Sequence, residues 1–425
     1  MVVTNPEHAP MSFLTDLKPD LRWLASGFLL MMFSGFGQTY YIALFAGHIK
    51  ADLTLTDGSF GALYAVATLA SAVVLTWAGK LADTIPIRWL SAGVMAGLAL
   101  TAVLMAYTYN AWVLALALFG LRFFGQGMLT LTAMTAMGRW FNRKRGRAVA
   151  VAAMGMPSGQ AFLPAAAVAV MVATSWRQSW LYAALMLAVV GIPLFLYLLH
   201  HERHPTRGPM ARAGHQPDDR RHQWTRSEVL RHASFYLLMP VILAPPFILT
   251  AVFFYQVNLV ELRGWRLEMF ASTFSLLAIV NVFASLTAGS LVDRFGARRL
   301  LATYLVPMGI ATLLLGFSGS VAVLLVVMAL FGVTMGCASA TSGALWAELY
   351  GITHLGSIRA VVTALVVIST AVAPGLVGLL LDAGVALELQ LLAMGGYSLL
   401  MAGWAVWLVP RLGAIALSDG IPAGG

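Results

Sequence analysis

The residue with the clearest chemical potential is Arg122, which lies deep inside a long apolar stretch. It stands roughly 12 residues into the stretch 111–138, which in a helix is roughly 18 Å from one end. All seventeen acidic residues lie in polar segments or at the ends of apolar stretches, so none is placed to pair with it there. A guanidinium at this depth can serve as the counter-charge of an incoming anion. Alternatively, it bonds to carbonyls and hydroxyls of neighbouring helices.

Several uncharged polar residues recur at helical spacing. Gln126 follows Arg122 by one turn and shares its face. The others that we expect to line a chamber are Ser34, Gln38 and Tyr41; Tyr64, Thr68 and Ser71; Asn281 and Ser285; and Tyr255 and Gln256, which follow an expected helix break at Pro245-Pro246. Hydrogen bonds between helices would explain the same residues equally well.

Membrane helices must position these residues, because the chain is too apolar for a soluble fold. It has 425 residues, of which 60% are hydrophobic and 10% are charged, whereas soluble domains carry about 25% charged residues. The apolar runs are too long for the strands of a membrane barrel, which have about 10 residues. We expect an all-α polytopic membrane protein with twelve transmembrane helices. The spans lie near residues 25–46, 58–78, 89–108, 111–138, 147–173, 178–199, 235–257, 269–292, 299–318, 321–346, 360–382 and 388–409.

One long polar segment separates the first six spans from the last six. It predicts an N-terminal six-helix bundle at 1–199, a basic cytoplasmic linker at 200–234 and a C-terminal six-helix bundle at 235–425. Thr225 and Glu228 fit a capping box, so a short helix should lead into span seven. The linker holds six of the nine histidines. Their spacing matches no closed metal site, so we expect neither a metal nor another cofactor.

The basic residues indicate the orientation in the membrane. With a cytoplasmic N-terminus, 21 of the 26 Lys and Arg residues fall on cytoplasmic segments. Cytoplasmic loops of membrane proteins accumulate these residues, so both termini should be cytoplasmic. The same rule explains the net charge of +9 without nucleic acid as a partner. We expect a protein of a bacterial cytoplasmic (inner) membrane. The single cysteine, Cys337, excludes an intrachain disulfide.

Two short motifs occur twice at nearly the same spacing. GKLADTIPIRWL at 79–90 returns as GSLVDRFGARRL at 289–300, and RAVA at 147–150 returns as RAVV at 359–362. The spacings of 210 and 212 residues indicate two repeated six-helix halves. Such repeats are typical of transporters, with a substrate site near the bilayer midplane between the halves.

The twelve spans, the central linker and the form G-x-L-x-D-R-x-G-x-R-R resemble the major facilitator superfamily. The copy at 289–300 is nearly complete, whereas in the copy at 79–90 Thr84 replaces the arginine and Pro86 replaces the glycine. The stretches 125–166 and 348–359 are similar to the monocarboxylate transporter and oxalate:formate antiporter branch of that family.

The resemblance implies alternating access, in which two halves rock about a central chamber. It also implies a cytoplasmic latch, a carboxylate from one half against the positive start of a helix in the other. Asp83 should lie near 357–359 and Asp293 near 145–147. The residues assigned to this latch are Asp83, Arg88, Arg145, Arg147, Asp293, Arg294, Arg298, Glu348 and Arg359. Simple anchoring of loops by their charges is the alternative.

The likeness to the monocarboxylate branch has one departure that bears on the substrate. Members of that branch use charged residues in spans eight and eleven. Here span eight has only Asn281 as a strong polar group before Asp293, and span eleven has Ser369 and Thr370. Oxalate is therefore disfavoured, and a monocarboxylate-like anion fits better. The main alternative is export of a neutral or hydrophobic drug-like compound.

The sequence is compatible with several mechanisms of coupling and with functions other than transport. With no acidic residue in mid-span, facilitated diffusion, exchange with a counter-solute and symport of a proton with the substrate are all compatible with the sequence. A membrane enzyme and a transporter-shaped receptor are the alternatives outside transport. No H-E-x-x-H or G-x-x-x-x-G-K-[ST] motif is present, so we expect no enzyme and no ATP-driven pump. One chain holds both halves, so a monomer should suffice.

Overall fold

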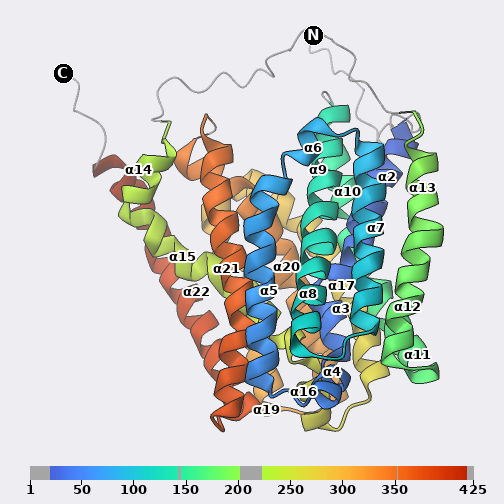
Figure 1. Ribbon diagram of the computed structural model, residues 1–425. Helices are drawn as coiled ribbons and strands as arrows, with labels where there is room; N and C mark the ends of the chain where they lie inside the picture. Colours follow the sequence, from blue (N-terminus) through green and yellow to red (C-terminus); the bar gives the residue numbers. More distant parts are fainter. Residues whose placement is uncertain (1–19, 142–144, 202–222, 352, 419–425) are drawn as a thin grey trace, which may run out of the picture.

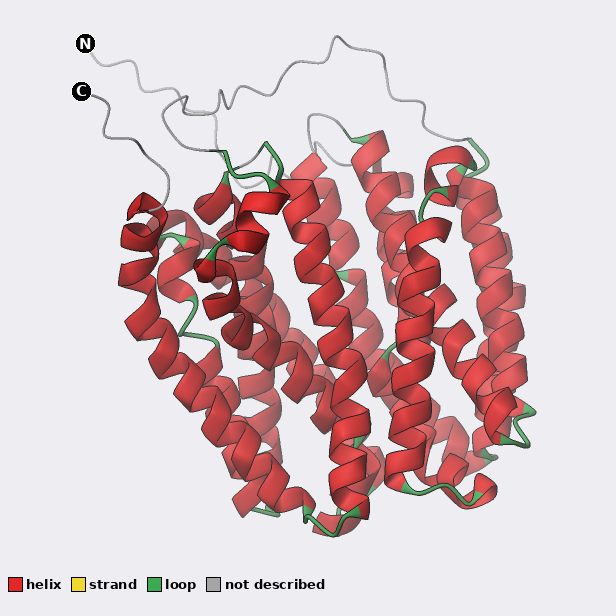
Figure 2. Ribbon diagram, turned by 60° about the vertical axis from the view of Figure 1, so that its left-hand side comes forward, coloured by secondary structure: helices red, strands yellow, loops and turns green. Residues whose placement is uncertain are grey.

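The computed structural model describes residues 20–141, 145–201, 223–351 and 353–418, and within these ranges the regular elements are helices (Figures 1 and 2). Eleven helices are long and apolar enough to cross a membrane. A twelfth span is formed by Leu21–Gly37 and Thr39–Leu53, which are bent by 45° at Gln38. The predicted all-α membrane fold is therefore confirmed.

The N-terminal half contains the first six spans. Its elements are α2 (Leu21–Phe33), η2 (Ser34–Gly37), α3 (Thr39–Ile42), η3 (Ala43–Phe45), α4 (Ala46–Leu53), α5 (Asp57–Ala78), α6 (Leu81–Thr84), α7 (Ile87–Ala106), α8 (Ala111–Gly120), the π-helical η4 (Leu121–Leu129), α9 (Thr130–Trp140), α10 (Arg145–Ala153), α11 (Gly155–Ala173), α12 (Trp176–Met186), the π-helical η5 (Leu187–Gly191) and α13 (Ile192–Leu198).

The C-terminal half contains the other six. Its elements are α14 (Arg226–Arg231), α15 (Ala233–Phe254), α16 (Gln256–Arg263), α17 (Leu267–Phe295), α18 (Ala297–Leu300), α19 (Leu305–Phe317), α20 (Val321–Tyr350), α21 (Leu355–Asp382) and α22 (Leu387–Ser418). The capping box is confirmed: Thr225 N donates to the Glu228 carboxylate over 2.7 Å, and Glu228 N donates to Thr225 Oγ1 over 3.4 Å.

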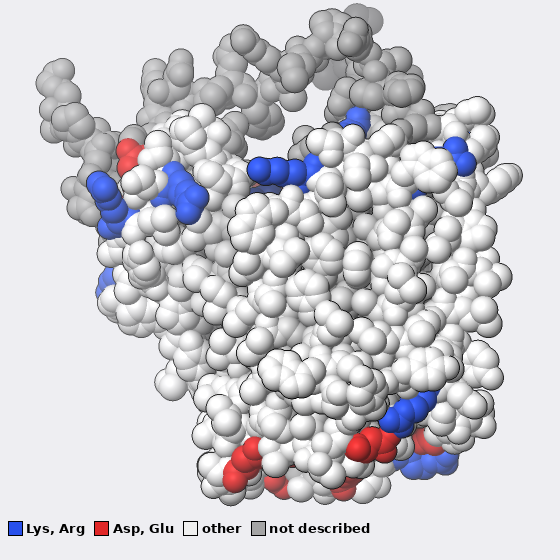
Figure 3. Space-filling view, in the orientation of Figure 1, with Lys and Arg blue, Asp and Glu red and all other residues white. Residues whose placement is uncertain are grey.

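The two ends of the bundle differ in charge. We name them the α14 end and the α16 end; they are at the top and bottom of Figure 1. Of the Lys and Arg residues that the structure describes, four lie at the α16 end: Lys50, Arg177, Arg263 and Arg266. Figure 3 shows mostly Lys and Arg among the charged residues at the α14 end, both signs of charge at the α16 end, and a surface nearly free of charged residues between. This separation fits a membrane crossing between the two ends.

Polar caps fix where three spans of the N-terminal half begin at the α16 end. Thr56, Asn110 and Ser175 accept hydrogen bonds from Ser59 N, Val113 N and Gln178 N, at the starts of α5, α8 and α12. Each cap satisfies one of the amides that a helix start leaves without an internal partner. The connections before these helices can therefore be short.

Two helix pairs join the halves. The second span, α5, packs along the eleventh, α21, and the fifth, α11, packs along the eighth, α17. Figure 1 shows α5 and α21 side by side over much of their length. These pairs are related by the same repeat that the sequence motifs indicate.

The prediction of a helix break at Pro245-Pro246 is wrong. The helix α15 continues from Ala233 to Phe254 with three prolines inside it. A proline removes one internal hydrogen bond, but in membrane helices neighbouring groups can satisfy the freed backbone. Other carbonyls of this helix accept side-chain hydrogen bonds from neighbouring helices: Ser369 Oγ donates to Leu243 O and Tyr397 OH donates to Pro240 O.

Two glycines allow the first span to cross the fourth in close contact. A Cβ atom on Gly37 would lie 2.7 Å from Gly125 Cα, and one on Gly125 would lie 2.6 Å from Gly37 Cα. Both distances are too short for a side chain. The crossing lies where the first span bends and where the fourth becomes π-helical, and it determines where Arg122 lies.

Substituting Gly37 by Ala should therefore destabilise the protein strongly. The added methyl meets backbone atoms of η4 that cannot move independently, and overpacking of this kind costs about 1–3 kcal/mol or more. We expect a clear drop in the thermal unfolding temperature of the purified protein. Gly93→Ala is the control, because no atom lies within 4 Å of a Cβ at Gly93. An equal drop in both variants would contradict the role given to this crossing.

Candidate functional site

Arg122 lies at the crossing of the first and fourth spans and is only 2% exposed. Its Nη1 donates to Gly37 O over 3.2 Å and lies 3.5 Å from Thr39 Oγ1. Its Nε is buried and has no hydrogen-bond partner. No acidic side chain among the described residues pairs with it. The alternative interpretation, in which Arg122 bonds to a neighbouring carbonyl, thus holds for Nη1. The Nε donor of the same guanidinium remains unsatisfied.

Tyr64 completes the surroundings of this guanidinium. The Arg122 Cζ lies 5.3 Å from the centre of the Tyr64 ring, within the range of a cation–π contact. The Tyr64 hydroxyl is 2.7 Å from Thr39 Oγ1. Residues from spans one, two and four therefore surround one buried positive charge. The sequence identified Arg122 and Tyr64 but missed Thr39 and the Gly37 carbonyl, which only the helix break brings to this position.

A cavity of about 400 Å³ lies in the C-terminal half between α15, α20 and α21. Its lining includes Pro245 and Pro246 at mid-helix and Trp346 and Arg359 nearer the α14 end. Its hydroxyl groups come from Tyr304, Ser339, Ser342 and Thr363. Ser339, Ser342 and Thr363 could not be singled out from the sequence, because single Ser and Thr residues in apolar helices are common and most bond to their own backbone.

A network of side chains joins the halves at the α16 end. The Asp57 carboxylate accepts hydrogen bonds from Lys50 Nζ at 2.6 Å and from Asn258 Nδ2 at 3.0 and 3.1 Å. Lys50 Nζ also donates to Asn258 Oδ1 over 3.1 Å. Lys50 and Asp57 belong to the N-terminal half and Asn258 to the C-terminal half. An ion pair within the N-terminal half is thus bound to the C-terminal half by the Asn258 amide.

A carboxylate against a helix start strengthens the same end. Asp382, the last residue of α21, accepts a hydrogen bond from Gly58 N at the start of α5 over 3.0 Å. Tyr255 OH donates to Pro374 O over 2.7 Å and lies 3.3 Å from Asp57 O. Gln256 Nε2 donates to Tyr40 O over 2.8 Å. Together with the Lys50, Asp57 and Asn258 contacts, these form the α16-end latch.

Comparison with known proteins places the chain in a family. The sequence profile described as Major Facilitator Superfamily matches residues 27–287 and 263–417. The chain belongs to the major facilitator superfamily. A comparison with curated protein sequences gives no match.

Solved structures of this superfamily have the same fold. A bacterial homologue of the human lysosomal transporter Spinster, in an inward-facing and occupied conformation, superposes with a TM-score of 0.67 at 16% identity. That match covers 94% of this chain and 98% of the other. The nucleoside transporter NupG gives a TM-score of 0.67 at 13% identity, covering 93% and 98%. At these identities the likeness concerns the fold alone.

The second copy of the superfamily motif is tied to its own half at the α14 end. Arg298 Nε donates to Glu348 Oε1 over 2.6 Å, and Ala297 N donates to Glu348 Oε2 over 2.7 Å. Glu348 thus binds the start of α18 from the end of α20. Arg359 donates to Gly343 O, and Arg294 stacks on Phe295.

The predicted cytoplasmic latch is not formed between described groups. Asp293 is exposed and has no hydrogen-bond or ion-pair partner among the described residues. The side chains of Asp83 and Arg145 lie outside the described part. Arg147 is exposed, and Arg88 stacks on Trp89. Hydrogen bonds between described groups of the two halves lie on the α16 side. The latch at the α14 end therefore stays a prediction.

The remaining predicted residues are distributed over several settings. Ser34 donates to Met31 O, and Tyr41 packs edge-on against Phe36, Phe45 and Trp180 in the N-terminal core. Tyr255 OH bonds to Pro374 O in its own half and to Asp57 O across the interface, and Gln256 Nε2 bonds to Tyr40 O across it; their place in a chamber stays a prediction. Gln38 Nε2 and Thr68 Oγ1 are buried without partners, and Gln126 and Asn281 are partly exposed.

Neutralising Asp382 should loosen the α16 end. Asp382→Asn removes a charge-assisted hydrogen bond to the start of α5, which we expect to cost about 1–3 kcal/mol of closure. Spin labels on Thr54→Cys and Ser320→Cys, in a Cys337→Ser background, report the distance between the halves at this end. We expect longer and broader distances in Asp382→Asn than in the parent protein.

Glu388→Gln is the matched control. Glu388 lies at the same end, six residues further along the chain, and it makes no hydrogen bond or ion pair among the described residues. A distance distribution that changes equally in both variants, or in neither, would remove Asp382 from the closing contact.

Proposed function

We propose that this protein is a secondary transporter that moves a small organic monoanion, with Arg122 as the counter-charge in the central site. We further propose that the α14 end faces the cytoplasm. Transport would proceed by rocking the N-terminal and C-terminal halves against each other, so that the site opens alternately to the two sides.

The observation that carries the proposal is the unsatisfied state of Arg122. A buried charge costs several kcal/mol unless it is paired and hydrogen-bonded. Here one nitrogen bonds to Gly37 O, the Tyr64 ring lies beside the guanidinium, and Nε has no partner. A carboxylate would satisfy both the missing hydrogen bond and the missing charge. A neutral compound could satisfy only the first.

The number of charges supports a monoanion over a dianion. Among the described residues, Arg122 is the one charged side chain far from both ends of the bundle. A second carboxylate on the substrate would enter the same low-dielectric region without a cation to pair with it. The hydroxyl groups of Ser339, Ser342 and Thr363 can accept and donate hydrogen bonds to the rest of an organic molecule.

The conformation supports a state in which the protein is open towards the cytoplasm. The α16-end latch is formed, whereas Asp293 at the α14 end has no partner. The cavity of about 400 Å³ lies towards the α14 end. The excess of Lys and Arg at that end is typical of the cytoplasmic side. A solute would thus reach this cavity from the cytoplasm in this state; Arg122 itself is not among the residues that line the cavity.

Removing the arginine should abolish recognition of the anion. We expect a thermal-shift screen of monocarboxylates to give compounds that stabilise the wild type. Arg122→Ala should weaken the binding of such a compound at least tenfold, since a charge-assisted hydrogen bond is worth about 1.5–3 kcal/mol. Arg122→Lys, which keeps the charge, should retain part of the affinity. Counterflow in proteoliposomes then tests whether the bound compound is transported.

Two controls separate anion recognition from general damage. The carboxamide of the same compound should bind the wild type weakly, because it lacks the charge. Arg263 resembles Arg122 in donating to backbone carbonyls, but it lies at the α16 end. The Arg263→Ala variant should therefore bind the carboxylate as tightly as the wild type does. Unchanged affinity in Arg122→Ala would refute the assigned role. A carboxamide that binds as well as the acid would instead indicate a neutral substrate.

A further inference from the structure

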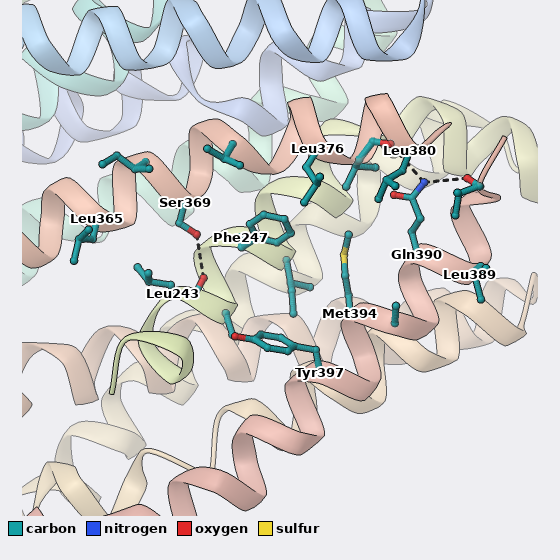
Figure 4. A pocket seen from close by; sticks show the side chains of 17 residues that line it. Leu243, Phe247, Leu365, Ser369, Leu376, Leu380, Leu389, Gln390, Met394 and Tyr397 are labelled. Atoms are coloured by element: carbon teal, nitrogen blue, oxygen red, sulfur yellow. Dashed lines mark hydrogen bonds between the residues drawn. The ribbon is translucent and has the colours of Figure 1, made fainter. Parts of the chain in front are cut away.

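A large apolar cavity in the C-terminal half does not include Arg122 in its lining. It has a volume of about 760 Å³ and lies between α15, α21 and α22 (Figure 4). Its walls are almost entirely apolar, from Leu243 and Phe247 to Leu376 and Met394. Ile368, Leu376 and Leu389 are 46%, 46% and 60% exposed, so the cavity is open along the outer surface of the bundle.

The position of this groove limits what can fill it. Its residues on α21 run from Leu365 to Leu380, which at 1.5 Å per residue is roughly 22 Å. The helix α21 is one of the membrane-spanning helices, so the groove faces hydrocarbon. One leaflet of the bilayer core is roughly 15 Å deep. The groove therefore has the length of a single acyl chain together with the start of its head group.

One polar group inside the groove lacks a partner. Gln390 is 4% exposed, and its Nε2 donates to Val385 O over 3.0 Å and to Val377 O over 3.4 Å. These two bonds fix which end of the amide is oxygen. The oxygen, Oε1, is buried and accepts no hydrogen bond. Figure 4 shows Gln390 at one end of the groove, near Leu380 and Met394. An occupant with an N–H or O–H group at that end would satisfy it.

Charge at the mouth of the groove favours a cationic donor. Gln390 lies at the α16 end, close to the connection from α21, which ends at Asp382, to α22, which carries Glu388 in its first turn. Val385, in that connection, also lines the groove. Two carboxylates near the mouth disfavour an anionic head group and favour an ammonium group.

We propose that this groove binds a phospholipid of the α16-side leaflet, with one acyl chain between α15, α21 and α22 and an ammonium N–H donating to Gln390 Oε1. The lipid would support α15 where Pro240, Pro245 and Pro246 interrupt its internal hydrogen bonds. The helices α15 and α21 also border the smaller cavity near Arg359. The lipid would therefore contact two helices that line both the groove and that cavity. This site is independent of the transported substrate.

A second groove on the molecule provides an internal comparison. It has about 480 Å³ and lies between α7 and α12, η5 and α13 in the N-terminal half. Its lining is apolar, from Ala96 and Leu100 to Leu185 and Ala188. No unpartnered polar atom of a described residue lines it. It should accept acyl chains without preference for a head group.

Native mass spectrometry of the purified, delipidated full chain can test the proposal. The probes are phosphatidylethanolamine and its N-methylated series with identical acyl chains. The mono- and dimethyl forms keep an N–H donor, whereas phosphatidylcholine has none. We expect the first three to bind alike and phosphatidylcholine to bind at least about fivefold more weakly. Equal binding of all four lipids, or phosphatidylglycerol binding as tightly as phosphatidylethanolamine, would overturn the head-group assignment.

Paired variants locate the bound lipid. Ala393→Trp fills the proposed groove, and Ala188→Trp fills the comparison groove in the same way. We expect the head-group preference to disappear in Ala393→Trp and to persist in Ala188→Trp. Loss of the preference in both variants, or in neither, would refute the location. The lipid series on the wild type decides the head-group question even when a variant fails to fold.

Discussion

One hydrogen bond, from Arg122 to the Gly37 carbonyl, holds the centre of the N-terminal half together. In a regular helix the Tyr41 amide would bond to that carbonyl, but here it bonds to Gln38 O. The 3-10 turn Ser34–Gly37 and the extended Gln38 free the carbonyl at the level where the fourth span widens into a π-helix. A freed polar group inside a bilayer needs an internal partner. The arginine, the helix break and the two close glycines are therefore one structural unit.

The antiparallel pair α5 and α21 explains how closure at one end relates to the other. At the α16 end, the carboxylate that finishes α21 binds the start of α5. At the α14 end, the superfamily motif predicts the converse contact, from Asp83 beyond the end of α5 to the start of α21. Each contact places a negative charge at the positive end of a helix. Because the two helices are rigid and packed along their length, a rocking motion that separates one pair of ends brings the other pair together.

Much of the fold could be predicted from the sequence because hydrophobicity decides which segments cross a membrane. The capping box at Thr225 and the burial of Arg122 follow from equally local signals. The π-helix in span four could not be predicted, since no residue type marks it; it depends on the contact between Gly37 and Gly125. The α16-end latch was missed for a similar reason. Lys50, Asp57, Asn258 and Asp382 look like ordinary polar residues of helix ends until the helices bring them together.

The two copies of the superfamily motif differ in how firmly each is held at the α14 end. In the second copy Gly296 has a φ of 84°, a conformation that glycine adopts without strain, and Glu348 binds the amide of the next residue. In the first copy Pro86 occupies this position with a φ of −54°. The repeat spacing of 210 residues puts Gly138 where the second half has Glu348. Asp293 is thus carried on a turn fixed to α20 and must move with the C-terminal half. The turn that carries Asp83 has Pro86 in place of Gly296, so the two copies of the motif shape this end of their halves differently.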